Sequence, residues 1–277
     1  MSDASEVDAK RFNAFEAEGW EASAVGYHDF FEPITTRAIE PLMDAVGVAD
    51  GDRVLDVATG PGYVAAAAAA RGAQVTGIDI SAKMVALAGA RHPGIRFLRG
   101  DAEALPFEPH SFDAVVASFA ILHLGRPEVA TAEFARVLAP GGRVGVTVWD
   151  VPSRARLVGL LVDAVTAAGA EPPSDVPVGP DFFRFADDRE LAELLVGVGL
   201  GEVEVRTISF NHGLADANEL WEGLLAGTVR MRALIAGQSE SVKRRIHAEL
   251  KRLAAAHRSG DELQIPVSIK LGTASKP

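Results

Sequence analysis

Short apolar runs and helical segments alternate between about residue 53 and residue 150 of this 277-residue chain. The expected strands, which are rich in β-branched and other apolar residues, are Arg53–Val57, Gln74–Asp79, Ile95–Leu98, Phe112–Ala117 and Arg143–Trp149. The helical segments between them are Tyr63–Arg71, Ser81–Arg91 and Arg126–Leu138. Such alternation builds right-handed βαβ units and a parallel sheet with helices on both faces. We therefore predict an α/β, doubly wound, Rossmann-like fold.

The regular pattern loosens on both sides of this region. Residues 1–45 are expected to form an N-terminal helical cap, with Val7–Met43 helical, in front of a cofactor-binding core at residues 46–150. Segments 151–187 and 214–260 are expected to be lid or insertion segments, and further strands are expected at Glu202–Phe210 and Gln264–Leu271. Loops of this length are usually functional or disordered. We predict one domain over residues 1–277, with the extra segments lying over one edge of the sheet.

Composition excludes several classes of protein. The formal net charge of −11 argues against a nucleic-acid partner, because phosphate contacts need a basic face. The chain has no cysteine, which excludes disulfides, thiolate metal sites and cysteine nucleophiles, and its scattered acids indicate no metal site. The polar N-terminus does not resemble a signal peptide, and no apolar run approaches the roughly 20 residues of a membrane span. We expect a cytoplasmic protein whose partner is a small molecule and not a membrane or a nucleic acid.

The turn after the first expected strand, "RVLDVATGPGYVA", has two glycines, Gly60 and Gly62, at the spacing of a dinucleotide-binding loop. Ligands of open α/β sheets bind outside the carboxyl ends of the strands, and glycines let the backbone approach them closely. A pyrophosphate would need backbone N–H donors, but Pro61 has none and Asp56 would repel an anion. These features favour a cationic ligand, and a turn without any ligand stays open as the alternative.

Two more acids follow the next strands. Asp79 ends the second strand about 20 residues beyond the turn, where an acid accepts hydrogen bonds from ribose hydroxyls. Asp101 follows the third strand, where its carboxylate can accept from the exocyclic amine of an adenine. A ligand that combines a ribose, an adenine amine and an ammonium group without a phosphate is S-adenosylmethionine.

Four motifs then resemble, in order, those of the class I S-adenosylmethionine-dependent methyltransferases. They are "VLDVATGPG", "VTGIDISAKMVALA", "GDAEALPFEPHSFDAVVASFAILHL" and "EFARVLAPGGRVGVTVWD", and they span about residues 53–150. The small-molecule branch that includes the ubiquinone and menaquinone biosynthesis enzymes is the most similar type. The resemblance implies a seven-stranded sheet whose last strand is antiparallel. It also implies in-line methyl transfer to an oxygen, carbon or nitrogen atom of a small metabolite, with S-adenosylhomocysteine as product.

The resemblance also implies roles for the matching positions. The methionine part of the cofactor would be surrounded by Asp56, Ala58, Gly60 and Gly62. Asp79 would bind the ribose hydroxyls, with Ile80 and Met84 near the adenine. Asp101 and Ala102 would contact the adenine edge, and Ser118 and Phe119 would lie beneath the cofactor.

Candidates for the acceptor side are weaker. His123, just after the fourth strand, is the candidate catalytic base or substrate contact; alternatively it is bonded within its loop, since methyl transfer by proximity alone needs no base. Substrate-binding candidates, each with core packing as the alternative, are Trp20, Tyr27, Trp149, Phe182 and Phe183.

Two other functions stay open from the sequence. An NAD(P)-dependent oxidoreductase with an unusual turn is one, and a methyltransferase-like scaffold that binds the cofactor without transferring its methyl group is the other. The helical insertion at residues 214–260 would be a substrate cap or a subunit contact, so a homodimer is one expected assembly.

Overall fold

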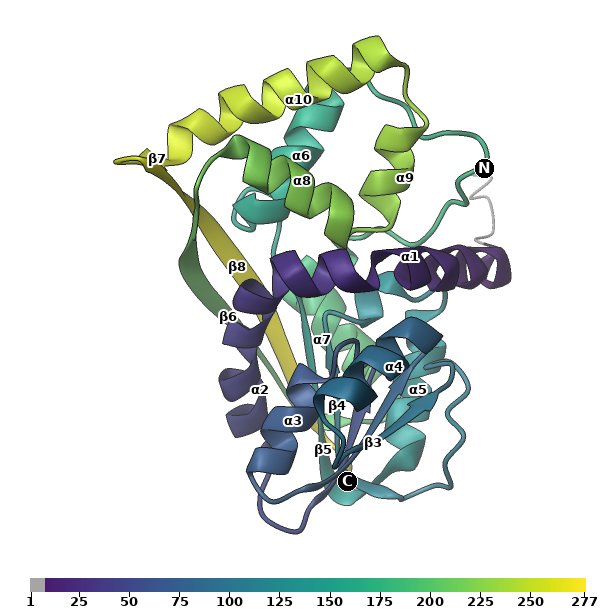
Figure 1. The fold of residues 1–277 in the computed structure, drawn as a ribbon. Helices are drawn as coiled ribbons and strands as arrows, with labels where there is room; N and C mark the ends of the chain where they lie inside the picture. Colours follow the sequence, from purple (N-terminus) through teal and green to yellow (C-terminus); the bar gives the residue numbers. More distant parts are fainter. Residues whose placement is uncertain (1–7) are drawn as a thin grey trace.

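A twisted sheet, with helices packed against it and a group of helices beyond one end of its strands, forms the structure (Figure 1). This computed structural model describes residues 8–277. Within them the strand order is β3-β2-β1-β4-β5-β8-β6. The bounds are β1 Arg53–Val57, β2 Gln74–Asp79, β3 Arg96–Arg99, β4 Phe112–Ser118, β5 Leu138–Trp149, β6 Gly201–Leu214 and β8 Glu262–Ser275. A two-residue strand, β7 (Arg258–Ser259), pairs only with β8.

The first five strands are parallel, and β8 runs antiparallel to both of its neighbours, β5 and β6. The predicted Rossmann-like sheet with an antiparallel last strand is therefore confirmed. The helices between the strands are α3 (Tyr63–Ala70), α4 (Ala82–Arg91) and α5 (Pro127–Val137). Ser81 caps α4 by accepting from the Met84 N–H at 3.1 Å, and Pro127 occupies the first turn of α5, where its missing N–H costs nothing.

The stretch expected to be helical, Val7–Met43, consists of α1 (Ala9–Thr35), a 3₁₀ turn η1 (Thr36–Ala38) and α2 (Ile39–Val46), while Val7 lies outside the described residues. Pro33 cannot donate to the helix ladder. The hydroxyls of Thr35 and Thr36 bond back to the carbonyls of the preceding turn, which bends helices. Pro33, Thr35 and Thr36 explain why the α-helix α1 ends at Thr35 and the chain continues as a 3₁₀ turn.

Strands β6 and β8 are each longer at both ends than the strands predicted from the sequence. They pair with each other from Gly201 and Ser275 to Leu214 and Leu263, and they continue past the rest of the sheet toward the upper helices (Figure 1). Exposed and half-buried residues alternate along β6, as on a strand with one solvated face, whereas most of β8 is buried between two strands. The pairing partner therefore sets the length of each strand.

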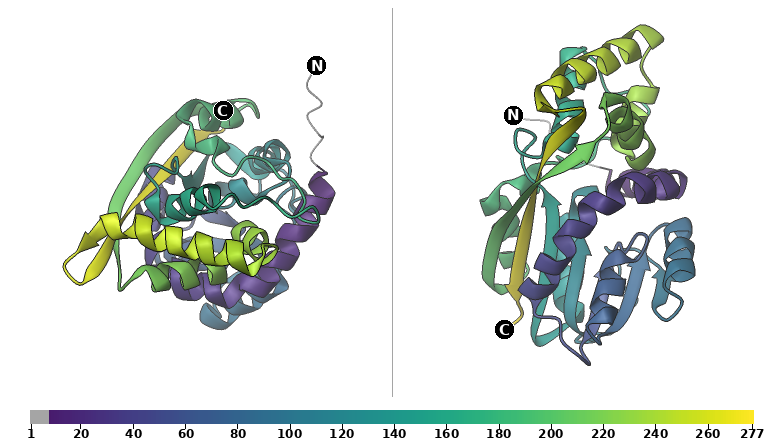
Figure 2. Two further views of the ribbon diagram at one scale, coloured as in Figure 1. Left: turned by 90° about the horizontal axis from the view of Figure 1, so that it is seen from above. Right: turned by 60° about the vertical axis from the view of Figure 1, so that its left-hand side comes forward.

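The upper helices are α6 (Arg156–Ala167), α8 (Ala217–Gly227), α9 (Arg230–Ala236) and α10 (Glu240–Ala254), and α7 (Asp188–Val196) packs lower down against β6 and β8. The right-hand view of Figure 2 shows α1 running between this group and the sheet. On α10 the apolar side chains of Ile246 and Leu250 are buried. No helix in residues 8–277 is long and apolar enough to cross a membrane.

Helices α1 and α8 approach each other through glycines. A Cβ atom added to Gly26 would lie 2.5 Å from the carbonyl oxygen of Ala226, and one added to Gly227 would lie 2.7 Å from the Phe31 ring. These distances are far inside van der Waals contact, so neither position has room for a larger side chain. The close approach holds the upper helices against α1.

We predict that Gly26→Ala destabilises the protein by about 1–3 kcal/mol, because overpacking against a backbone carbonyl outweighs the better helix propensity of alanine. The matched control is Gly89→Ala in α4, where nothing lies within 4 Å of the added Cβ. That change should stabilise the protein by up to about 1 kcal/mol. Urea unfolding of both variants measures the two effects, and equal signs would contradict this description of the α1–α8 contact.

Candidate cofactor and acceptor site

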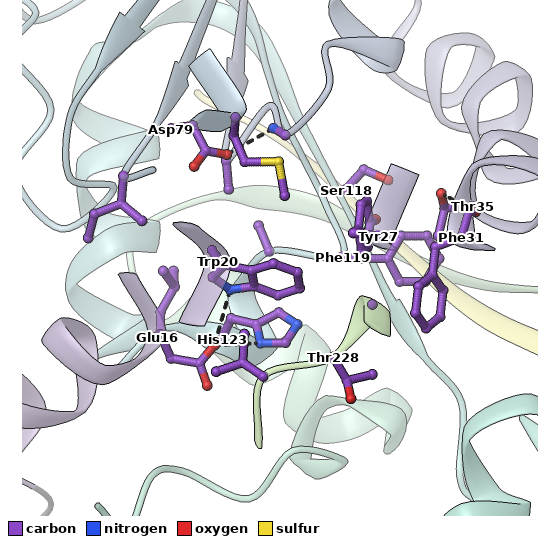
Figure 3. Close-up of a pocket in the computed structure, with 18 of the residues that line it drawn as sticks. Glu16, Trp20, Tyr27, Phe31, Thr35, Asp79, Ser118, Phe119, His123 and Thr228 are labelled. Atoms are coloured by element: carbon purple, nitrogen blue, oxygen red, sulfur yellow. Dashed lines mark hydrogen bonds and ion pairs between the residues drawn. The ribbon is translucent and has the colours of Figure 1, made fainter. Parts of the chain in front are cut away.

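A cavity of about 290 Å³ lies between the carboxyl ends of the strands and the upper helices. Its lower wall comes from the segments that follow β1, β2, β3 and β4, and its upper wall from α1, α6, α8 and α9. Figure 3 shows Asp79 and Ser118 on the sheet side, and Glu16, Trp20 and Tyr27 contributed by α1. Most of the site residues expected from the sequence meet in this one space.

Asp56 lies at the end of β1 and is 1% exposed. One of its oxygens accepts from the Thr59 hydroxyl at 2.5 Å and from the Ala65 N–H at 3.0 Å, so the carboxylate caps the start of α3. Burial raises the pKa of Asp56 to about 7, and the nearby charge of Asp79 adds to this, although both hydrogen bonds oppose it. Keeping this buried carboxyl group ionised therefore costs free energy of folding unless a cationic ligand lies beside it.

Asp79 ends β2 and faces the glycine turn. Its two oxygens accept from the Gly60 N–H and the Ser81 N–H, each at 2.9 Å. Burial raises the pKa of Asp79 to about 6, in spite of these two hydrogen bonds. The bond to Gly60 fixes the turn after β1 against the end of β2, so the turn is positioned before any ligand binds.

The remaining predicted residues of the lower wall also line the cavity. They are Ala58, Ile80, Met84, Asp101, Ala102, Ser118 and Phe119. Asp101 accepts from the Glu103 N–H at 2.8 Å, which fixes its loop. Ser118 shares a hydrogen bond of 2.9 Å with Thr147 of the neighbouring strand.

Two of the four described non-glycine residues with positive φ follow strands at this wall. Ala58 follows β1 with φ 53°, and Phe119 follows β4 with φ 54°. Each such residue costs of the order of 1 kcal/mol and persists only where the surroundings impose it. Two N–H···O contacts to Thr147, at 2.9 and 3.1 Å, hold the Phe119 backbone in place. Both strained residues directly follow a strand end and line the cavity.

Gly62 is the one predicted cofactor residue that does not line the cavity. Its φ is 86°, and an added Cβ would lie 2.9 Å from the His92 ring and 3.0 Å from the Phe97 ring. The glycine therefore allows α3 to pack closely against the segment around α4 and β3. Pro61 and Tyr63 on either side of it do line the cavity.

Aromatic side chains, from helix α1, from strand ends and from the loop before α7, line much of the rest of the cavity. The predicted residues Trp20, Tyr27, Trp149, Phe182 and Phe183 all line it, together with Phe31 and Phe119. Trp20 packs edge-on against Tyr27 at 5.5 Å between ring centroids, and Trp149 lies 4.5 Å from Phe119. Offset and edge-on rings of this kind form a rigid apolar wall.

His123 sits in the 3₁₀ turn η2 (Ile121–His123) after β4 and also lines the cavity. Its Nδ1 lies 3.0 Å from Oε2 of Glu16, and its ring packs edge-on against Trp20 and Phe182. Figure 3 shows the other side of the ring directed away from Glu16. The alternative of a histidine bonded within its own loop does not hold, because its partner lies on α1.

Sequence reasoning missed Glu16, which contacts His123, and Arg230, which contacts Glu16. The Glu16 side chain is 4% exposed, and Oε1 accepts from Nε of Arg230 at 2.8 Å. Although burial opposes ionisation, His123 and Arg230 hold the pKa of Glu16 below its ordinary value. Nothing distinguishes Glu16 in the sequence from Glu18 or Glu21, and Arg230 lies in a segment with no motif.

The charges of the cavity decide which kind of cofactor fits. Glu16, Asp56, Asp79 and Asp101 line it, and Arg230, already paired with Glu16, is the only lysine or arginine among the described lining residues. A cationic sulfonium nucleoside fits this wall, whereas a pyrophosphate would meet two buried carboxyl groups without a cation. No group of three or more metal-ligating side chains was found within residues 8–277. The fold and this acidic wall define a nucleoside-binding protein of the methyltransferase type.

Comparison with known proteins agrees with this class. A family model described as a methyltransferase domain matches residues 55–146. The chain is 35% identical over 183 residues to the demethylmenaquinone methyltransferase of Renibacterium salmoninarum, which covers 63% of this chain and 77% of that protein. It is 46% identical over 91 residues to the enzyme of the same name from Chlorobaculum tepidum, covering 32% of this chain and 38% of that one.

Solved structures show the same fold at low sequence identity. Phosphoethanolamine N-methyltransferase 2 of Haemonchus contortus, solved with phosphomonomethylethanolamine and S-adenosylhomocysteine, has a TM-score of 0.59 at 22% identity and covers 96% of this chain and 60% of its own. The YcgJ protein of Bacillus subtilis has a TM-score of 0.56 at 20% identity, covering 87% of this chain and 98% of its own. With the 35% identical relative, these findings place the chain in a family: it belongs to the class I S-adenosylmethionine-dependent methyltransferases.

The raised pKa of Asp56 predicts an unusual pH dependence of stability. With a folded-state pKa near 7, Asp56 is protonated in the native protein but ionised in the unfolded chain between about pH 4 and pH 7. The contribution of Asp56 to the free energy of unfolding is therefore complete below about pH 4 and is lost as the pH rises to about 7. We predict that Asp56→Asn, which removes the buried charge, raises the Tm of the ligand-free protein at pH 8 by roughly 2–5 °C and flattens its pH dependence between pH 5 and 8.

Thermal unfolding across that pH range measures the effect. The matched control is Asp113→Asn, because the Arg53 guanidinium holds the pKa of the exposed Asp113 below its ordinary value. That control should not raise the Tm at pH 8, and it should keep the wild-type pH dependence. An Asp56→Asn variant that is less stable than wild type at pH 8 would show that the carboxylate stabilises the turn on balance.

Proposed function

We propose that the protein transfers a methyl group from S-adenosylmethionine to a small, largely apolar aromatic metabolite. One observation carries the proposal: a single cavity has buried acids at its sheet end and a wall of aromatic side chains from α1, β5 and the loop before α7. We further propose that residues 46–150 form the cofactor-binding core. The segments 1–45, 151–187 and 214–260 would close over it as cap and lid.

The cofactor would lie along the acidic wall. We propose that Asp56, Ala58 and Gly60 surround its methionine part, that Asp79 accepts from the ribose hydroxyls, and that Ile80, Met84, Asp101 and Ala102 contact the adenine, above Ser118 and Phe119. Gly62 would act indirectly, by allowing the turn to pack closely. When bound, S-adenosylmethionine supplies an electrophilic methyl group on a positively charged sulfur.

Aromatic residues would bind and orient the acceptor. We propose that Trp20, Tyr27, Trp149, Phe182 and Phe183 hold an apolar ring and exclude water from the reacting atoms. Correct placement along the line of displacement provides most of the acceleration in such reactions. The relatives named demethylmenaquinone methyltransferases support a ring of this kind, since their name describes a quinone-type acceptor.

We propose that His123 is the general base for an acceptor that carries an ionisable hydroxyl group. Its Nδ1 is engaged by Glu16, and no described residue forms a hydrogen bond to its Nε2. As the acceptor forms its bond to the methyl carbon, the S–CH₃ bond breaks with its electron pair remaining on sulfur. The hydroxyl proton passes to Nε2, and the imidazolium later releases it to water. Such assistance is worth about 10²–10⁴-fold in rate.

The two alternative functions are disfavoured. An NAD(P)-dependent oxidoreductase would need to place a pyrophosphate beside Asp56 and Asp79, both buried and neither paired with a cation. A scaffold that binds the cofactor without using it would need no histidine directed into the cavity beside an aromatic acceptor wall.

We also propose that the protein works in the cytoplasm, without nucleic acid or a membrane as partner, and that a homodimer is one assembly it forms. The formal net charge of −11 supports the absence of nucleic-acid binding.

We predict that Asp79→Ala abolishes binding of S-adenosylhomocysteine, whereas His123→Ala leaves binding intact and lowers turnover about 10²–10⁴-fold. Calorimetry with S-adenosylhomocysteine and single-turnover rates with S-adenosylmethionine separate the two effects. NADH and NADPH should give no heat of binding in the same experiment. Wild-type turnover of His123→Ala would contradict the base assignment, and tight binding of a nicotinamide cofactor would overturn the proposed function.

We predict that hydroxylated aromatic rings, such as substituted naphthols and hydroquinones, are methylated, whereas phosphoethanolamine is not, because Arg230 is already paired with Glu16 and leaves no free cation for a phosphate. Phe182→Ala should raise the KM for an active ring at least tenfold without changing S-adenosylhomocysteine binding. Val129→Ala, on the exposed side of α5, is the control and should match wild type. Methylation of phosphoethanolamine in preference to every aromatic compound would contradict the acceptor class.

A further inference from the structure

Three charged or titratable side chains from distant parts of the chain meet in the wall of the cavity. Glu16 lies on α1, His123 in η2, and Arg230 is the first residue of α9. Glu16 Oε2 lies 3.0 Å from His123 Nδ1, and Glu16 Oε1 accepts from Arg230 Nε at 2.8 Å. Both carboxylate oxygens are therefore engaged, and the 4% exposed side chain has almost no contact with water.

The contact with Glu16 fixes the tautomer of His123. A carboxylate can only accept hydrogen bonds, so the proton of the neutral imidazole must lie on Nδ1. The Nε2 atom is then left with a lone pair, which makes it an acceptor on the side of the ring that Figure 3 shows turned away from Glu16. A carboxylate that holds a catalytic histidine in this way orients the ring and need not take up its proton.

Arg230 changes the charge that His123 experiences. Alone, the Glu16 carboxylate would favour a protonated imidazolium, which cannot act as a base. Paired with Arg230, the carboxylate belongs to a unit of zero net charge, so a proton on His123 would leave the cluster with a net charge of +1. The two partners thus act on the imidazole in opposite directions.

The position of Arg230 is fixed by contacts on every side. Its two terminal nitrogens donate to the carbonyls of Pro180, at 2.9 Å, and Leu122, at 2.8 Å. Its guanidinium carbon lies 4.4 Å from the ring centroid of Phe12 and 5.6 Å from that of Phe182. A guanidinium held by four neighbours stays at a constant distance from Glu16.

Other charged groups near His123 are already paired or more distant. Glu103 bonds to Arg126 at 2.7 Å, and Asn13 links this pair to the loop after His123 by donating to Glu103 and accepting from the Gly125 N–H. Asp56, Asp79 and Asp101 line the same cavity from the sheet side. Glu16 contacts the histidine itself, and Arg230 contacts Glu16 and the carbonyl of Leu122, the residue before the histidine.

We propose that Glu16 and Arg230 are positioning residues that act as a pair: Glu16 holds His123 with Nε2 free, and Arg230 holds the Glu16 carboxylate in place and offsets its charge. This inference rests on the proposed function, because an oriented histidine with a free Nε2 matters only if it takes the proton of the acceptor. It assigns to α1 and α9 a direct part in controlling the base, beyond enclosing the cavity.

The experiment is an NMR titration of the His123 ring in the ligand-free full-length protein. Glu16→Gln removes the anion and leaves Arg230, so the protonation midpoint of His123 should fall by about one pH unit. Arg230→Gln leaves the carboxylate unbalanced, so the midpoint should rise by about one pH unit. The acid limb of kcat/KM against pH should move in the same two directions.

Two further variants separate charge from packing. Arg230→Lys keeps the positive charge but loses the planar guanidinium, so its midpoint should stay near wild type even if its stability falls. Arg126→Gln removes a cation from the neighbouring Glu103 pair and should not move the midpoint.

Opposite shifts in the two charge variants support the proposal. Shifts of the same sign, or none, would overturn it and leave the three residues as a structural tie between α1 and α9. Should Arg230→Gln not fold, Glu16→Gln decides alone, because its midpoint must fall. The titration involves no substrate, so its failure is distinct from a failure of methyl transfer, which the turnover assay reports.

Discussion

The buried carboxylate of Glu16 joins the parts of the chain that enclose the cavity. Besides the Trp20 indole one turn along α1, its partners are His123, after β4, and Arg230, which lies 214 positions beyond Glu16 in the chain. A carboxylate with 4% exposure is costly to leave unpaired, so both partners must be in place when α1 closes over the sheet. The contact between α1 and α8 through Gly26 and Gly227 allows this closure, because it brings the upper helices close enough for Arg230 to reach Glu16. The shape of the cavity follows from satisfying one buried charge.

The sheet side of the cavity also contains features that cost stability. Burial raises the pKa of both Asp56 and Asp79, and Ala58 and Phe119 hold positive φ at the ends of adjacent strands. Such costs are commonly concentrated at functional sites, where the rest of the fold imposes them. A cationic nucleoside would relieve the electrostatic part, and the strained backbone would already be in position. The wall is therefore formed before any ligand binds, and a positively charged methyl donor would stabilise it.

Local sequence signals predicted the sheet and most of its acidic wall. The strands β1, β2 and β4 follow from periodicity, and the acids Asp56, Asp79 and Asp101 follow from their places at the ends of expected strands. The break between α1 and α2 was missed, because hydroxyl groups that bend a helix look like ordinary helix residues in a pattern. Gly62 fits a cofactor motif, but a glycine is required there because the rings of His92 and Phe97, which come from elsewhere in the chain, leave no room for a side chain.

The sequence by itself determined the class of fold, the family and the acidic end of the cavity, because these depend on residues close together in the chain. Tertiary structure alone decided what surrounds His123. Glu16 and Arg230 carry no motif, and their relation to the histidine exists only after α1 and α9 pack over the sheet. The same holds for the aromatic wall, whose rings come from α1, β5 and the loop before α7. Contacts across more than a hundred residues leave no periodic or local trace in a single sequence, so the folded chain is needed to read them.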